Sequence, residues 1–401
     1  MNRPAAKPKD PQPGGSEERS RLARAARHDT VLGGATIGLV AVGATATVMA
    51  RRLAAFRRRD AEADVIFGRD RSGKGYPVLA DVVLTDDGLS LHVEQVGPDD
   101  AGLTVVFVHG YTLNLASWYY QREELTPLTG RSLRLLFYDQ RGHGASGWRD
   151  PERGTIDQIG DDLRRVLDER VPTGRIVLIG HSMGGMAIMG LAERRPELFG
   201  SRIVGVALLS TSTGNLASVG FGMPQAITGL STAVLPLVAK LARQRPQVAE
   251  RTRRLGKDIA FIATKRMTFS GRVIAPGLAS YVDRMIASTP ADVIGAFFPS
   301  LAGFDKSGVL TPLENVATLI LCGDADRTTP KAHSELLAEE LPDSQLVIVE
   351  NAGHLAMLEQ PAVVNQHLRT FLRRCSRRRA AAPQAHSAPD KGHSLARPRD
   401  A

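Results

Sequence analysis

Cysteine is scarce in this chain: only 2 of the 401 residues are cysteines, Cys322 and Cys375. Cys322 ends an apolar run with the composition of a core strand, and Cys375 lies near the carboxyl terminus, so we expect no disulfide between them. Spacings of Cys and His that bind zinc are also missing, including His-Glu-x-x-His. The sequence therefore predicts no metal site, and it leaves the redox compartment open.

Positive charge is concentrated at the two ends of the chain. The formal net charge is +9. Residues 1–60 hold 12 Lys and Arg against 5 Asp and Glu, and residues 373–401 hold 8 against 2, which leaves the body of the chain at −4. That body also lacks a basic stripe interleaved with aromatic residues. We therefore expect no nucleic-acid partner, and we predict that residues 1–30 and 376–401 are disordered basic tails.

One long uncharged segment interrupts the basic amino end. Residues 31–50 contain no charged residue, and arginines flank them on both sides. A helix of this length just spans a bilayer, although glycines and threonines weaken both insertion and helix formation. We predict a membrane-associated protein anchored through residues 31–50, in either orientation. One alternative is a segment that lies on the membrane surface or pairs with another helix. Another is a secretory signal with its small-x-small site at residues 44–46. The alternative locations are therefore secreted or cytoplasmic.

A glycine-rich turn lies between an apolar strand and a helix. The apolar residues 176–179 precede Gly180-His181-Ser182-Met183-Gly184-Gly185, and a helix-forming stretch follows. A turn this sharp forces its apex residue, Ser182, into strained dihedrals and needs glycines beside it. Ser182 is then held at a strand's carboxyl end, near a helix amino terminus that favours developing negative charge. We predict a nucleophile at Ser182; the alternative is an ordinary Gly/Ser turn. The turn holds neither G-x-G-x-x-G nor a phosphate-binding lysine, so no cofactor is expected.

A serine hydroxyl is a weak nucleophile and needs a base and an orienting acid. The apolar run 317–322 ends in a loop that contains Asp324 and Asp326, and the run 345–349 leads into a loop that contains His354. Loops at the carboxyl ends of parallel strands lie along one sheet edge, so an acid and a base from these loops can reach Ser182. The acid could also be a turn former, and His354 an ordinary loop histidine.

These motifs and their order resemble the alpha/beta-hydrolase superfamily over about residues 75–373. The family's G-x-x-D-x-x-x-P acid loop matches Gly323, Asp326 and Pro330, which favours Asp326 over Asp324. Its A-G-H histidine loop matches the tripeptide that ends at His354. The resemblance implies a catalytic triad of Ser182, Asp326 and His354.

The resemblance also supplies the oxyanion hole. His109-Gly110 follows the apolar run 105–108, and in the family such a pair turns the next N–H into the site. By this resemblance the donors are the backbone N–H groups of Tyr111 and Met183. His109 could be a second base, but we expect it to hydrogen-bond neighbouring loops. The loop with Asp139, Arg141 and His143 is expected to tie loops together by paired charges.

Strands alternate with amphipathic stretches in the body of the chain, which predicts an α/β fold with a mostly parallel sheet covered on both faces. We expect one hydrolase domain over residues 61–375. Between about 213 and 312 the pattern becomes helical with no clear strand, at a position where the family inserts a helical cap. A partly ordered loop is the alternative there.

The resemblance therefore implies a serine hydrolase that cleaves carboxylic esters, with lipid-like or medium-chain acyl groups. The turn at Ser182 is similar to that of monoacylglycerol lipases, and the region of His109-Gly110 and Ser117-Trp118 is similar to that of esterases and cofactor-free perhydrolases. Expected partners are a small-molecule ester and membrane lipid. The alternatives are a carbon–carbon bond hydrolase or a perhydrolase/haloperoxidase on the same triad, and a non-catalytic binding protein of the same fold. The sequence does not set the oligomeric state.

Overall fold

The structure, a computed structural model, describes residues 78–130, 132–214, 268–271 and 274–378. All of these belong to one unit of the chain, residues 63–401. The predictions for the basic leader 1–30 and the uncharged segment 31–50 lie outside the described residues, as do much of the predicted cap and the tail from residue 379.

The chain forms an eight-stranded sheet in the order β1-β2-β4-β3-β5-β6-β7-β8. The strands are β1 (Val78–Leu84), β2 (Ser90–Val96), β3 (Leu103–Val108), β4 (Arg134–Tyr138), β5 (Arg175–His181), β6 (Ile203–Leu209), β7 (Ala317–Gly323) and β8 (Gln345–Val349). β1 and β2 pair antiparallel, as do β2 and β4, and the pairs from β4 to β8 are parallel. The predicted α/β fold with a mostly parallel sheet is confirmed.

The central strands are mostly apolar and buried because both faces of the sheet are covered. In β3, Val106 and Val108 belong to the hydrophobic core on one face, whereas Val105 and Phe107 belong to the core on the other. This alternation is the two-residue period of a strand. All six residues of β3 are buried, which explains why the strand shows a continuous apolar run in the sequence.

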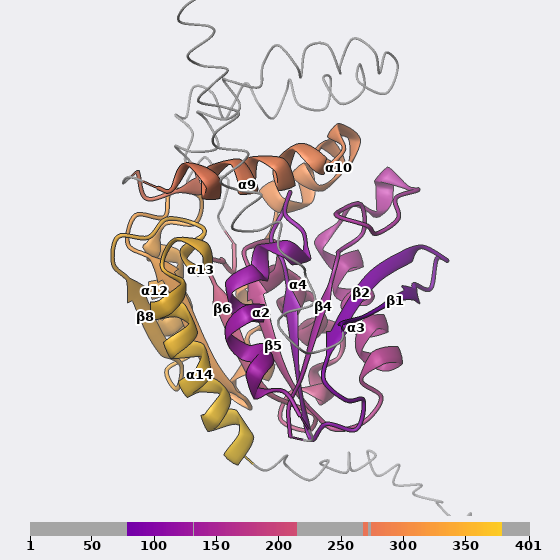
Figure 1. Cartoon of the computed structure of the whole chain (residues 1–401), viewed down its shortest axis with the longest axis vertical. Helices are drawn as coiled ribbons and strands as arrows, with labels where there is room; N and C mark the ends of the chain where they lie inside the picture. The colour runs from indigo at the N-terminus through magenta and orange to yellow at the C-terminus, as the bar shows by residue number, and fades with distance from the viewer. Residues whose placement is uncertain (1–77, 131, 215–267, 272–273, 379–401) are drawn as a thin grey trace, which may run out of the picture. The chain divides into compact units, whose positions relative to one another are not determined.

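Helices cover both faces of the sheet (Figure 1). The α-helices are α2 (Tyr119–Leu125), α3 (Ile156–Arg170), α4 (Met183–Arg194), α9 (Pro276–Ser288), α10 (Ala291–Ala302), α11 (Thr311–Glu314), α12 (Lys331–Glu340), α13 (Ala356–Glu359) and α14 (Pro361–Arg377). Residues of α3, α4 and α12 pack in the core on one face, and residues of α2, α13 and α14 pack in the core on the other. α14 continues to Arg377, past the predicted domain boundary at 375.

α3 shows how the sequence encodes one of these helices. Thr155 caps its amino terminus by accepting a hydrogen bond from the Gln158 N–H at 3.2 Å. Its apolar residues follow the helical period, and all of them are buried: Ile156, Ile159, Leu163, Val166 and Leu167. The amphipathic helix predicted from this spacing is therefore present.

Within the predicted cap, the described part contains α9 and α10, which lie over the strand ends in Figure 1. Two hydrogen bonds hold α10 to the loops beneath: the Tyr111 hydroxyl donates to the Ile294 carbonyl (2.5 Å), and Trp148 Nε1 donates to Asp292 (2.9 Å). α9 is held by the Tyr281 hydroxyl, which donates to the Ala116 carbonyl (2.7 Å). Among the described residues, no single helix has the length and apolarity to span a bilayer; α9 and α10 meet that test only as a pair bent by 91°.

Candidate active site

Ser182 lies at the apex of a strained turn between β5 and α4. Its dihedrals are φ 51° and ψ −118°, a region that non-glycine residues rarely adopt. The turn is held by the end of β6 and the loop that follows it, because the Ser182 N–H donates to the Leu209 carbonyl (2.9 Å) and the Thr211 hydroxyl donates to the Ser182 carbonyl (2.8 Å). The strain predicted from the sequence is present, and neighbouring loops over-determine it.

The glycines of this turn are required by close backbone contacts. A Cβ on Gly180 would lie 2.7 Å from the Gly184 carbonyl oxygen, and a Cβ on Gly184 would lie 2.1 Å from the Val108 carbonyl oxygen. The helix amino terminus can therefore approach the end of β3 only without side chains at these positions. This approach brings α4 beside the loop that contains Tyr111.

Asp326 follows β7 and is buried in a shell of donors. Its carboxylate accepts hydrogen bonds from the Thr328 and Thr329 N–H groups and from the Thr329 hydroxyl, each at 2.9 Å. Burial raises the pKa of Asp326, but the nearby His354 charge and the hydrogen bonds from His354 and Thr329 outweigh it and hold the pKa below its usual value. Asp326 is therefore a carboxylate that can orient an imidazole.

His354, on the loop after β8, faces this carboxylate. Its Nδ1 lies 2.9 Å and 3.2 Å from the two oxygens of Asp326. Because an ionised carboxylate only accepts, Nδ1 carries a proton, and in the neutral imidazole the lone pair is then on Nε2. This is the tautomer that a general base requires.

The turn Gly180–Gly184, called the elbow below, and the loop that contains His354 lie against each other. The ring of His181, the neighbour of Ser182, is centred 4.8 Å from the ring of His354, and Ser182 and His354 are each 8% exposed. Within the described residues the Ser182 hydroxyl makes no hydrogen bond to His354; such bonds are often long in a free enzyme and tighten with substrate. The structure thus brings the three predicted residues to one edge of the sheet, and it pairs two of them directly.

The two predicted oxyanion donors lie on either side of the elbow. Met183 begins α4, so its N–H is one of the free donors at a helix amino terminus. Tyr111 follows Gly110, which packs against Ser182: a Cβ on Gly110 would lie 3.2 Å from the Ser182 Cβ. In the described part of the chain, neither amide is used in a hydrogen bond.

His109 and His143 are buried hydrogen-bond bridges. His109 Nδ1 donates to the Gly110 carbonyl (2.8 Å) while its Nε2 accepts from the Gln140 N–H (2.9 Å). Burial lowers the pKa of His109 well below its ordinary value, and burial lowers the pKa of His143 to about 4. Both rings are therefore neutral near pH 7, and the expectation that His109 ties loops together agrees with its contacts.

The expectation of paired charges in the following loop holds for one residue only. Arg141 forms an ion pair with Asp162 (2.6 Å) and a second with Asp87 (3.2 Å). Asp139 instead accepts hydrogen bonds from two backbone N–H groups, those of Leu115 and Ala145, both at 2.8 Å. A sequence pattern cannot show this, because the loops that supply backbone donors meet only in the fold.

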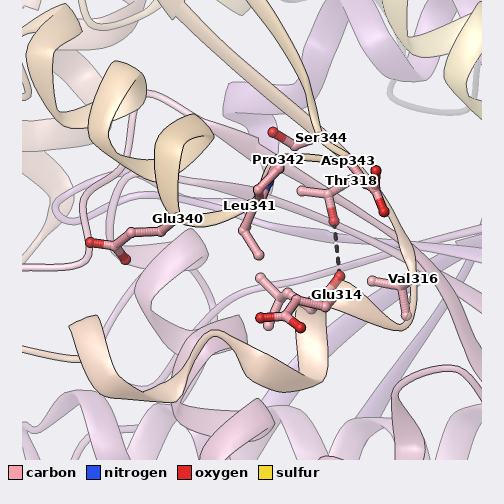
Figure 2. A pocket seen from close by; sticks show the side chains of 9 residues that line it. Glu314, Val316, Thr318, Glu340, Leu341, Pro342, Asp343 and Ser344 are labelled. Atoms are coloured by element: carbon pink, nitrogen blue, oxygen red, sulfur yellow. Dashed lines mark hydrogen bonds between the residues drawn. The ribbon is translucent and has the colours of Figure 1, made fainter.

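A cavity of about 400 Å³ lies elsewhere, between α11, α12 and the start of β7 (Figure 2). It is lined by Glu314, Glu340 and Asp343, and by Thr318, whose hydroxyl donates to the Leu313 carbonyl (3.3 Å). Thr318 is at the amino end of β7, whereas Asp326 follows the carboxyl end of the same strand. The cavity is therefore at the opposite edge of the sheet from Ser182 and takes no part in its chemistry. Among the described residues, no group of three or more His, Cys, Asp or Glu is placed to hold a metal ion.

A model of the alpha/beta hydrolase family matches residues 105–367, which include the elbow, the acid loop and the histidine loop. The chain belongs to the alpha/beta hydrolase family. The predicted resemblance is thereby confirmed, and solved structures of esterases are among the structural neighbours of this hydrolase.

Three similar proteins illustrate the range of this hydrolase's relatives. A thermophilic esterase from Thermogutta terrifontis is 29% identical, with a TM-score of 0.59 over 74% of this chain and 99% of the other. A 2-hydroxy-6-oxononadienedioate/2-hydroxy-6-oxononatrienedioate hydrolase from Cupriavidus pinatubonensis is 26% identical over 72% of this chain and 92% of its own. The dihydrolipoyllysine-residue acetyltransferase component of an acetoin cleaving system from Pseudomonas putida is 24% identical, and the match covers 69% of this chain and 65% of that protein.

Sequence reasoning missed several residues that support the site. Thr329 holds Asp326 through both its hydroxyl and its N–H. Glu359 accepts hydrogen bonds from the Gly353 N–H (2.8 Å) and the Ser270 N–H (2.9 Å), and so fixes the loop before His354. Thr329 lies within the acid-loop motif and Glu359 five residues after His354, but only the fold shows which groups they bind.

Proposed function

We propose that this hydrolase cleaves carboxylic esters through an acyl-enzyme on Ser182. The observation that carries the proposal is the pairing of His354 Nδ1 with the buried Asp326 carboxylate (2.9 Å). The loop that contains His354 also packs against the elbow at Ser182. This pairing leaves His354 Nε2 as the base, beside a serine whose strained turn projects it from the end of β5.

The proposed reaction has two steps. In the first, Ser182 Oγ attacks the ester carbonyl, its proton moves to His354 Nε2, and that proton then passes to the leaving alcohol. The Tyr111 and Met183 N–H groups bind the negative oxygen of the tetrahedral intermediate. In the second step, water attacks the acyl-enzyme and gives its proton to His354, which restores Ser182 and releases the acid.

The ester chemistry is supported by the similarity to the Thermogutta terrifontis esterase. We propose lipid-like or medium-chain acyl esters as substrates. A series of p-nitrophenyl esters of increasing acyl length tests this directly, and a kcat/KM that peaks at acetate and falls steadily with length contradicts a lipid-like acyl group.

The serine mechanism is tested by labelling the full chain with a fluorophosphonate and mapping the modified peptide by mass spectrometry. We expect one label, on Ser182. Ser182→Ala should abolish both labelling and turnover, with a loss in kcat on the order of 10⁴-fold or more, because the triad acts as a unit. Labelling of a different serine overturns the assignment, and a protein that takes no label supports a binding role for the fold.

Carbon–carbon bond hydrolysis on the same triad is the second candidate. It is favoured by the similarity to the Cupriavidus pinatubonensis hydrolase, which is named for a 2-hydroxy-6-oxo acid. Comparing kcat/KM for p-nitrophenyl esters with that for a 2-hydroxy-6-oxo-dienoate separates the two. A preference of more than about tenfold for the dienoate, a difference of about 1.4 kcal/mol in the barrier, replaces the ester proposal.

We also propose that residues 31–50 attach the protein to a membrane, because this uncharged segment is flanked by arginines that anionic lipid attracts. Fractionating cells that express the full chain tests the attachment, and a carbonate wash separates a spanning segment from a surface-bound one. A protein found wholly in the soluble fraction, or one whose mature amino terminus follows Ala46, contradicts it.

A further inference from the structure

His181 is a buried histidine that the proposed reaction does not use. It is the last residue of β5, directly before Ser182, and it is 1% exposed. Its ring packs between the ring of His354, centred 4.8 Å away, and the edge of Trp118, centred 6.4 Å away. The residue therefore adjoins the proposed nucleophile in the chain and contacts the proposed base in space.

The hydrogen bond of His181 goes to the backbone of the other histidine. His181 Nε2 lies 2.9 Å from the His354 carbonyl oxygen. A carbonyl only accepts, so the His181 proton is on Nε2 and that nitrogen is the donor. Burial and the neighbouring His354 charge lower the pKa of His181 to about 3, so the ring stays neutral and keeps this single proton at neutral pH.

The other ring nitrogen of His181 faces the loop after β3, which contains Gly110 and Tyr111. His181 Nδ1 is buried and has no hydrogen-bond partner in the described part of the chain. A Cβ on Gly110 would lie 2.6 Å from it, so the imidazole occupies the space that a side chain at Gly110 would need. The His181 ring therefore contacts the loops that follow β3 and β8, although His181 itself belongs to β5, the strand that ends directly before Ser182.

The backbone around His354 is fixed by three contacts. The His354 N–H donates to the Thr268 carbonyl (2.9 Å), the Gly353 N–H donates to Glu359 (2.8 Å), and the His354 carbonyl accepts from His181. Only the last of these contacts comes from β5. It is thus the described hydrogen bond that ties the base to the strand of the nucleophile.

We propose that His181 is a positioning residue that sets the distance between His354 Nε2 and Ser182 Oγ. The proposal rests on the serine mechanism proposed above. Loss of the Nε2–H donor should let the histidine loop shift relative to the elbow, which slows proton transfer from Ser182 without weakening substrate binding.

Three variants of the full-length protein test this role. His181→Leu removes the donor at similar volume, His181→Gln places an amide N–H near the position of Nε2, and His181→Asn is the matched control because its amide reaches only the position of Nδ1. We expect His181→Leu and His181→Asn to lose on the order of 10- to 100-fold in kcat, the scale of a misplacement of about 1 Å. His181→Gln should stay within about fivefold of the wild type, and KM should change by less than about threefold in each variant.

The measurements are kcat and KM on a short p-nitrophenyl ester and the rate of fluorophosphonate labelling, with the thermal midpoint of each variant as a folding control. If His181→Leu does not fold, the comparison of Gln with Asn decides the matter. A kcat for His181→Leu within twofold of the wild type, equal losses in Gln and Asn, or a loss confined to KM overturns the positioning role. Wild-type protein that takes no label on Ser182 overturns the serine mechanism instead, and this inference with it.

Discussion

Two pairs of histidines lie at the same edge of the sheet and do different work. His109 and His143, on the loops after β3 and β4, have both ring nitrogens engaged with backbone groups: each donates from Nδ1 to a carbonyl and accepts at Nε2 from an N–H. His181, the last residue of β5, and His354, on the loop after β8, each use one ring nitrogen and leave the other without a bond among the described groups.

The comparison teaches that position at the catalytic edge does not make a histidine a base. A base needs a nitrogen whose lone pair is open and a second nitrogen held by a carboxylate, and of these four histidines His354 alone faces a carboxylate, that of Asp326. His143 is neutral because burial lowers its pKa to about 4, but its Nε2 already accepts the Thr112 N–H at 3.2 Å. The partners of the rings separate the two pairs, and the distance from a strand end does not.

The strongest test of this comparison exchanges one histidine from each pair. His354→Gln removes the base and should cost on the order of 10⁴-fold or more in kcat, because the triad acts as a unit. His143→Gln should cost about tenfold or less, because glutamine can still accept the Thr112 N–H and the change only loosens the loop at the oxyanion donors. Steady-state kinetics on a soluble ester measure kcat for both variants. Comparable losses in the two variants contradict the assignment of His354 as the base and His143 as a structural bridge.

The acid loop offers a second test with its own matched control. Asp326→Asn should lower kcat on the order of 10³- to 10⁴-fold, because an amide favours the wrong imidazole tautomer. Asp324→Asn should lower it by less than about tenfold, since this exposed residue only accepts the Ala352 N–H (3.2 Å). If the larger loss falls on Asp324, the acid is misassigned.

The neutral bridges make a prediction about stability and pH. The pKa of His143 falls from 6.5 to about 4 in the folded state, so the unfolded chain binds more protons between these values. The stabilising effect of the neutral ring is complete above pH 6.5 and is lost as the pH falls toward 4, at about 1.4 kcal/mol per pH unit for one proton.

Urea unfolding at pH 7, 6 and 5 measures this slope. In His143→Gln the free energy of unfolding should fall less steeply with acid than in the wild type, although the variant is less stable at pH 7. Equal slopes in the two proteins mean that His143 is not held neutral by burial.

The smallest effect is expected from deleting residues 1–60. Both pairs of histidines and all the proposed catalytic groups lie beyond residue 100, so kcat on a short soluble ester should stay within about twofold, which is under about 0.5 kcal/mol in the barrier. Action on ester presented in vesicles of anionic lipid should weaken, because the arginines that attract such a surface are lost. A large loss on the soluble ester shows instead that the amino end supports the catalytic site. In that case the two pairs of histidines do not account for the site by themselves.

Local patterns predicted much of the fold because they record burial directly. The apolar runs at 105–108, 176–179, 317–322 and 345–349 all fall in strands of the sheet, and the stripe from Ile156 to Leu167 is the buried face of α3. The strained turn at Ser182 was also predictable, since flanking glycines are the local condition for such a turn.

Long-range hydrogen bonds were not predictable in this way. Thr329 could be recognised only as part of the acid-loop motif, and Glu359 only by its place five residues after His354, while their roles depend on the loops that they hold. Asp139 was expected to pair with a charge and instead binds two N–H groups. A residue's partner across a sheet edge leaves no periodicity in the sequence, because the two segments are joined only by the fold.

By itself, the sequence determined the alternation of strands and helices, the elbow at Ser182 and the identity of the residues that could form a triad, because these depend on local backbone geometry and on burial. Only the tertiary structure decided which of the histidines faces a carboxylate, which are neutral bridges, and that His181 ties the His354 backbone to the end of β5. The reason is physical: a side chain's proton and charge are set by the groups packed around it, and those groups come from strands far apart in the chain.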